Sequence, residues 1–181
     1  MSADLGVRLA ALELKSPVIA GSGEATASAE QIRACLAAGA AAVVAKSVNE
    51  SAAARAQLRA AEYVLLDEQL NARPLGPAGR GDSLFCRSGL LDVELEEWIA
   101  TLAALDREAA ARDAYVVASL IVADVEEAVR LARLVEQAGL RWLELNVGAP
   151  HATEAAPGAI GTGVALVERV RAAVSIPNRS C

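Results

Sequence analysis

The sequence contains few of the residues from which metal sites, disulfide frameworks and catalytic triads are built. Its 181 residues include one histidine and three cysteines, and aromatic residues make up 3% of the chain. The cysteines lack a Cys-x-x-Cys spacing, so they predict neither a disulfide framework nor a metal site, and a reducing cytoplasm suits them best. Any Ser-His-Asp triad would have to use the single histidine, His151, and no nucleophile-elbow motif accompanies it.

Clusters of basic residues and long apolar runs are also missing. The net charge is -6 at pH 7, which disfavours nucleic acid as a partner. No apolar run approaches the roughly 20 residues of a membrane span, so we expect no membrane partner. Charged residues interrupt the segment 1–17, which argues against a signal peptide. Apolar residues still make up 54% of the chain, enough for one sizeable core, and no break in composition divides residues 1–181 into more than a single domain.

What the sequence does contain is a repeated rhythm of short apolar runs and amphipathic segments. The apolar runs are expected to be strands, and they cover residues 16–20, 41–45, 115–121 and 142–147. The segments at helical spacing follow them, over residues 28–38, 92–112, 124–138 and 161–174. The expected caps are Ser28, Asp92 and Asp124, and Gly39 and Gly139 are expected to end the first and third helices. In the last helix the inward residues are expected to be Val164, Val167, Val170 and Val174. Continuous apolar strands are typical of a parallel sheet with both faces covered. The predicted fold class is therefore α/β, with a small N-terminal β-hairpin over residues 7–14.

Two parts of the chain do not follow this rhythm. Residues 52–63 are expected to be helical, and residues 73–89, with two prolines and four glycines, are expected to form a long loop. The chain also ends in Asn-Arg-Ser-Cys, over residues 178–181, where a fifth strand should begin, and this ending does not resemble a strand. We therefore expect about four strand–helix units, with open sheet edges that invite pairing with another chain.

Polar or glycine residues stand at the C-terminal ends of three expected strands. In chain order they are Gly21, Ser22 and Gly23, then Lys46 and Ser47, and finally Asn146. Ligands of parallel α/β folds bind at such ends. Glu144 shares a strand face with Asn146, and both side chains need partners once they are buried. Each residue also fits a local role: the glycines an ordinary turn, Lys46 an extended surface side chain, and Asn146 a bond within its own turn.

Three phrases at these ends, LELKSPVIAGSG (12–23), AKS (45–47) and ELNVGAP (144–150), resemble the dihydroorotate dehydrogenase family, cytosolic class. That family consists of FMN-dependent (β/α)₈ barrels, so the resemblance implies a TIM-barrel-type fold of which this chain holds about the first four β/α units. It implies a flavoprotein oxidoreductase of pyrimidine metabolism that acts on a CH–CH bond of a small pyrimidine-type substrate. The residues that would bind FMN are Gly21, Ser22, Gly23, Lys46, Ser47 and Asn146. The residues that would contact the substrate are Lys46, Gly89, Leu90 and Asn146.

The family's proton-abstracting cysteine or serine has no clear counterpart in this chain. The turn after Asn146, residues 148–150, offers glycine, alanine and proline, none of which accepts a proton. Cys86, Ser88 and His151 are candidates for the base, and the catalytic residue stays unassigned. Cys86 also stands at the asparagine position of the family's N-x-x-G-L segment, which leaves the natural substrate open. Its alternative role is that of a buried, inert thiol.

The length of the chain raises a further question, because a complete barrel takes about 250 residues. We expect the chain to be C-terminally truncated, to form a homodimer, or to pair with a second polypeptide that completes the barrel. The later loops that hold the FMN phosphate in such barrels are missing from it. An alternative function is therefore a non-catalytic half-barrel that binds no flavin and acts through a partner or self-association. A third interpretation makes Lys46 the Schiff-base amine of a lyase or isomerase.

Overall fold

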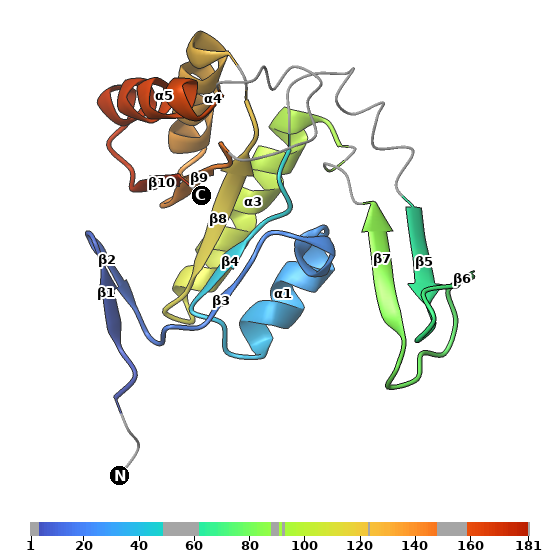
Figure 1. Cartoon of the computed structure of the whole chain (residues 1–181). Helices are drawn as coiled ribbons and strands as arrows, with labels where there is room; N and C mark the ends of the chain where they lie inside the picture. Colours follow the sequence, from blue (N-terminus) through green and yellow to red (C-terminus); the bar gives the residue numbers. More distant parts are fainter. Residues whose placement is uncertain are drawn as a thin grey trace.

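A parallel sheet with helices between its strands forms the body of the protein (Figure 1). The computed structural model describes residues 4–48, 62–87, 91, 93–122, 124–147 and 159–180. The strands are β1 (Val7–Leu9), β2 (Leu12–Leu14), β3 (Ile19–Ala20), β4 (Ala42–Val44), β5 (Glu62–Leu66), β6 (Ala72–Arg73), β7 (Ser83–Arg87), β8 (Tyr115–Leu120), β9 (Leu143–Leu145) and β10 (Asn178–Ser180). The helices are η1 (Glu24–Thr26), α1 (Ala29–Ala37), α3 (Leu95–Ala110), α4 (Val125–Gln137) and α5 (Ala159–Ala173). The predicted α/β class is confirmed.

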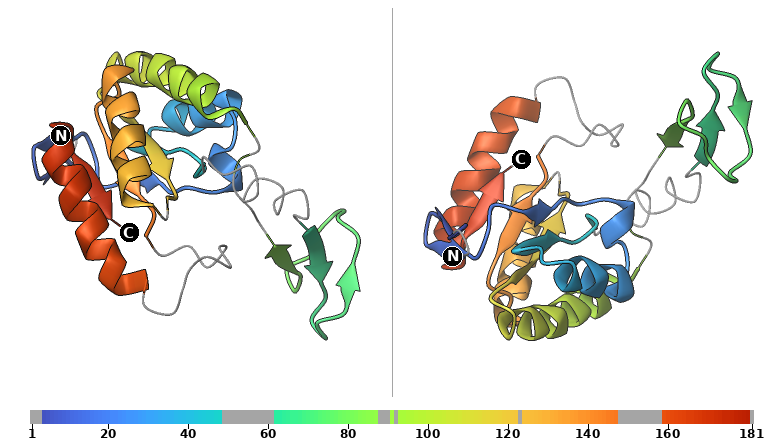
Figure 2. Two further views of the ribbon diagram at one scale, coloured as in Figure 1. Left: turned by 90° about the horizontal axis from the view of Figure 1, so that it is seen from above. Right: turned by 90° about the horizontal axis from the view of Figure 1, so that it is seen from below.

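The five strands of the parallel sheet lie side by side in the order in which they follow along the chain. That order is β3-β4-β8-β9-β10, and every neighbouring pair is parallel. A helix stands between each strand and the next, because a parallel connection requires a crossover. Both views of Figure 2 show these helices following one another around one side of the sheet. Since all five strands point the same way, their C-terminal ends meet at one edge.

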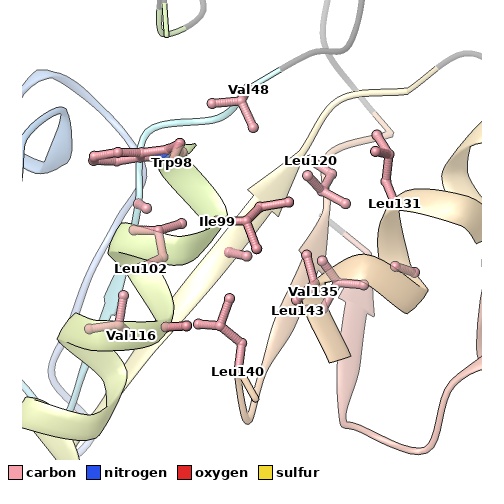
Figure 3. Close-up of a cluster of buried hydrophobic side chains, with 14 of the residues drawn as sticks. Val48, Trp98, Ile99, Leu102, Val116, Leu120, Leu131, Val135, Leu140 and Leu143 are labelled. Carbon is pink, nitrogen blue, oxygen red and sulfur yellow. The ribbon is translucent and has the colours of Figure 1, made fainter. Parts of the chain in front are cut away.

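One face of the sheet packs against the helices. Val116, Leu120 and Leu143 point from the strands into the main hydrophobic cluster, and all three are at most 1% exposed. Figure 3 shows them beside side chains of α3 and α4, among them Ile99, Leu102, Leu131 and Val135. The predicted apolar stripe of α3 is buried here as expected. Burying a side chain of this size stabilises the fold by about 1.5–3 kcal/mol.

The other face carries the residues of opposite parity and is partly covered by the N-terminal hairpin. β1 and β2 pair antiparallel, which confirms the predicted hairpin. Leu12 and Leu14 of β2 form a second cluster with strand residues that include Val44, Val117 and Trp142. The hairpin thus covers apolar strand residues that no helix reaches.

The helix boundaries follow local signals where those signals were read from the sequence. Ser28 Oγ accepts a hydrogen bond from the N–H of Gln31 at 3.2 Å, and the Asp124 carboxylate accepts one from Glu127 at 2.8 Å. Gly39 and Gly139 have φ angles of 101° and 87°, so both follow their helices in the left-handed region that glycine tolerates. Among the described helices, none is long and apolar enough to cross a membrane.

The segment that was expected to be a helix followed by a long loop contains a small antiparallel sheet, while residues 74–82 form a loop as expected. β5 lies between β6 and β7, and Leu65 pairs with Leu84 and with Arg73. The predicted helix is wrong for Glu62 and Tyr63, and its earlier residues lie outside the described part of the chain. The prolines and glycines between β6 and β7 lie in the loop that they predicted, whereas cross-strand pairing makes Arg73 and residues 83–87 parts of strands.

Two further expectations about helices and strands are corrected, and a third, the cap at Asp92, stays a prediction. Residues 178–180 form β10, which pairs with β9 in register from Asn178 and Leu143, so a fifth strand is present. Backbone pairing with an existing strand outweighs the polar composition of these residues. Val164 is 60% exposed and does not face inward, whereas Val170 and Val174 are buried as expected and Leu166 is buried beside them. Helix α3 begins after Glu94 without a side-chain cap, and the predicted cap Asp92 lies outside the described residues.

Candidate functional site at the C-terminal edge of the sheet

Six of the predicted site residues follow strands of one parallel sheet and lie at its C-terminal edge: Gly21, Ser22, Gly23, Lys46, Ser47 and Asn146. Backbone hydrogen bonds hold this edge together beyond the strands themselves. The N–H of Lys46 donates to the carbonyl of Thr26 at 3.0 Å, and that of Val48 donates to Ser119 at 3.1 Å. The N–H of Asn146 donates to the carbonyl of Leu120 at 2.8 Å. The turn after β3, Lys46 after β4 and Asn146 after β9 therefore stand at the same end of the sheet.

Lys46 is a buried cation with a carboxylate partner. The residue is 9% exposed, and its Nζ lies 2.5 Å from Glu24 Oε1. Glu24 belongs to η1, the short helix directly after the Gly-Ser-Gly turn, and its side chain is 48% exposed. A buried ammonium needs such a partner because desolvation of an unpaired charge is costly. The alternative of an extended surface lysine is wrong, since the side chain is held inside the site.

Tyr63 of β5 contacts the same carboxylate oxygen as Lys46. Its hydroxyl donates to Glu24 Oε1 at 2.7 Å. This hydrogen bond to a carboxylate stabilises the protonated phenol and raises the pKa of Tyr63 above its ordinary value of 10.0, with burial and the nearby Cys86 adding to the shift. Glu24 thus links Lys46 of the parallel sheet to the small antiparallel sheet. Neither Glu24 nor Tyr63 was identified from the sequence, although Glu24 follows the Gly-Ser-Gly turn directly.

A row of hydroxyl groups joins four neighbouring strand ends. Ser22 Oγ lies 3.3 Å from Ser47 Oγ, Ser47 Oγ lies 2.7 Å from Ser119 Oγ, and Ser119 Oγ donates to Glu144 Oε1 at 2.8 Å. The N–H of Ser47 also donates to Ser22 Oγ at 3.1 Å. Ser47 and Ser119 are buried, whereas Ser22 is exposed. Glu144 therefore has the hydrogen-bonding partner that its place on a buried strand requires. Ser119 was not identified as a site residue from the sequence.

The Gly-Ser-Gly turn is fixed from within and open on its outer side. The hydroxyl of buried Thr26 accepts from the N–H of Gly23 at 3.1 Å and donates to its carbonyl at 3.1 Å. A Cβ atom added at Gly21 or Gly23 would meet no described atom within 4 Å. Both glycines leave space beside the backbone, so a flat ligand could approach the turn closely.

Of the remaining candidates, Cys86 lies within the described residues and four others do not. Gly89, Leu90, Ser88 and His151 lie outside them. Cys86 lies on β7 opposite Tyr63 and is exposed, so the interpretation as a buried thiol is wrong.

Compared with models of known protein families and with curated proteins, the chain gave no match. The site combines one cation, hydroxyl groups, an amide and open backbone, and these are groups that bind the polar edge of a heterocyclic ring.

Proposed function

We propose that the chain provides the ring-binding half of the active site in an FMN-dependent oxidoreductase resembling dihydroorotate dehydrogenase. The observation that carries this proposal is the buried Lys46 amine at the edge where Ser22, Ser47 and Asn146 also lie. The substrate would be a small pyrimidine-type molecule with an oxidisable CH–CH bond. The enzyme would work in the cytoplasm.

The order of the strands supports a barrel of the (β/α)₈ type. Successive strands are added in one direction from β3 to β10. A doubly wound sheet would reverse direction at a switch point, where it would also bind its ligand. Eight strands close a TIM barrel, so the further strands would come from a continuation of the same chain, from a second copy or from another polypeptide.

The residues at this edge fit the isoalloxazine ring of FMN. Lys46 would stand where negative charge develops on the ring, because a fixed cation in a site with little water stabilises such charge strongly. The serine hydroxyls and the Asn146 amide would pair with polar ring atoms, and Gly21 and Gly23 leave room for the ring plane. Bound FMN would accept the hydride from the substrate. Lys46 would orient both molecules through its ammonium group.

A ligand that binds the Lys46 ammonium has to compete with the Glu24 carboxylate. The carboxylate already neutralises the ammonium, so a ligand gains less from Lys46 than it would from an unpaired cation. The resemblance assigns the FMN phosphate to later loops of the barrel. We therefore expect the 181-residue chain to bind FMN weakly, with a dissociation constant of roughly 10–100 µM, or about 5.5–7 kcal/mol of binding free energy.

Titration of the chain with FMN tests this function. The sequence contains two lysines, Lys15 and Lys46, so Lys15→Met is a matched control for Lys46→Met. Lys15 donates to the carbonyl of Arg112, remote from the site. We expect quenching of flavin fluorescence by the wild type and by Lys15→Met, and at least roughly tenfold weaker binding by Lys46→Met. No quenching by the wild type would instead support the non-catalytic half-barrel, and equal binding by both variants would exclude Lys46 from the site.

A further inference from the structure

Ser22, Ser47 and Ser119 form the row of hydroxyl groups that ends at the Glu144 carboxylate, and this carboxylate determines the direction of every hydrogen bond in the row. Ser119 donates to Glu144 Oε1, so the single hydroxyl proton of Ser119 is used in that bond. The 2.7 Å contact between Ser119 and Ser47 then requires the proton of Ser47. Because that proton is also used, the contact between Ser47 and Ser22 requires the proton of Ser22. Without it, two oxygen lone pairs would face each other.

The backbone fixes the last member of the row. The N–H of Ser47 donates to Ser22 Oγ at 3.1 Å, which holds this oxygen beside the row although the residue is exposed. Ser22 Oγ therefore donates once, towards Ser47, and accepts once, from the backbone. What remains on its exposed side is a lone pair, since a hydroxyl has one proton and two acceptor positions.

We infer that Ser22 offers a ligand only a hydrogen-bond acceptor, and that Glu144 imposes this polarity from three strands away through Ser119 and Ser47. The ligand atom opposite Ser22 must then carry an N–H or O–H group, whereas a carbonyl oxygen would be rejected. Ser22 is in this sense a specificity-determining residue, and Glu144 is a positioning residue. The inference deepens the proposed function, on which its choice of ligand rests: oxidised FMN carries a single ring N–H, the imide N3–H.

Neutron diffraction from deuterium-exchanged crystals of the full chain tests the polarity without any ligand. We expect the deuterium of Ser22 to point to Ser47, that of Ser47 to point to Ser119, and that of Ser119 to point to Glu144. A deuterium on Ser47 directed towards Ser22, or one on Ser22 directed away from the row, would overturn the inference. This result does not depend on whether FMN is the ligand.

A second experiment compares the binding of FMN and N3-methyl FMN to the full chain. Methylation removes the only ring N–H, so we expect it to weaken binding to the wild type by roughly tenfold. Ser22→Ala should bind both flavins equally, while Ser22→Thr should keep the preference. Ser83→Ala, on exposed β7, is the control and should also keep it. Glu144→Gln should reduce the preference, because an amide can donate to Ser119 and no longer fixes the direction of the row.

The two experiments separate the inference from the function. If FMN binds to the wild type but methylation has no effect, the polarity of Ser22 is wrong and the proposed function stands. If neither flavin binds, the proposed function fails, and the deuterium positions alone decide whether the polarity holds. If Glu144→Gln discriminates between the flavins as strongly as the wild type, Glu144 has no positioning role.

Discussion

At the scale of single residues, Glu136 shows how one carboxylate can hold a chain reversal. It is near the end of α4, and its Oε1 accepts hydrogen bonds from the N–H and hydroxyl of Ser175, at 2.7 and 2.6 Å, and from the N–H of Ile176 at 3.2 Å. These bonds, the Ser175 hydroxyl first among them, lower the pKa of Glu136 below its ordinary value of 4.5. They fix the segment that leads from α5 into β10.

This lowered pKa predicts a dependence of stability on pH. The unfolded protein binds the proton more tightly, so Glu136 stabilises the fold above pH 4.5 and this contribution is lost as the pH falls through the lower, folded value. Glu136→Gln should flatten the acid side of the stability profile, measured by urea unfolding between about pH 7 and about pH 3. Ser175→Ala should flatten it in part. Identical profiles for the wild type and Glu136→Gln would show that the carboxylate contributes nothing to acid sensitivity.

At the scale of elements, the antiparallel sheet β6-β5-β7 is the part of the protein that stands away from the parallel sheet (Figures 1 and 2). Its outward side chains include large apolar groups, with Leu84 59% and Phe85 44% exposed. The hydrogen bond from Tyr63 to Glu24 joins it to the candidate site. The carboxylate that neutralises Lys46 therefore also positions this sheet.

Removing the Tyr63 hydroxyl should loosen the antiparallel sheet. A hydrogen bond to a charged group contributes about 1.5–3 kcal/mol, so Tyr63→Phe should speed amide hydrogen exchange over residues 62–87 by roughly tenfold or more. Tyr115→Phe is the matched control, because Tyr115 is the other tyrosine and its ring packs against Trp142 on the parallel sheet. We expect no change over residues 62–87 in that variant. Equal exchange in Tyr63→Phe and the wild type would show that other contacts hold the sheet in place.

At the scale of the whole molecule, two clusters on opposite faces of the parallel sheet support the strand ends. The helices cover one face, and the β1–β2 hairpin covers part of the other. The N-terminal edge is fixed separately, by an ion pair in which Asp106, 1% exposed, binds Arg141 at 2.8 Å and accepts from the N–H of Val116. The candidate site thus rests on strands that are held on both faces and at the edge opposite to it.

Weakening the hairpin should expose the sheet beneath it. Leu14 is 4% exposed and packs in the cluster that contains Trp142. Leu14→Ala should lower the free energy of unfolding by about 2–4 kcal/mol, and in a Trp98→Phe background it should shift Trp142 emission to longer wavelength. Leu75→Ala, at a side chain that is 60% exposed, should change stability by less than about 0.5 kcal/mol. Unchanged emission in Leu14→Ala would show that Trp142 does not depend on the hairpin for its burial.

The sequence by itself determined the features that depend on residues close to one another along the chain. The caps at Ser28 and Asp124 act over three positions, and the apolar period that marks α3 and β8 is equally local. The α/β rhythm in turn implied that Lys46 and Asn146 would stand at one edge of a parallel sheet. These predictions are confirmed because local geometry and burial favour the same answer.

Only the tertiary structure decided which distant groups complete these features. β10 is a strand because β9 lies beside it, and β5 and β7 are strands because each pairs with the other, so no local pattern had to mark them. The pairing of Glu24 with Lys46 and the row from Ser22 to Glu144 likewise join separate segments. A buried polar group needs a hydrogen-bonding partner, and this need can be predicted from the sequence. Which residue becomes the partner depends on the fold, because only the fold brings the two groups together.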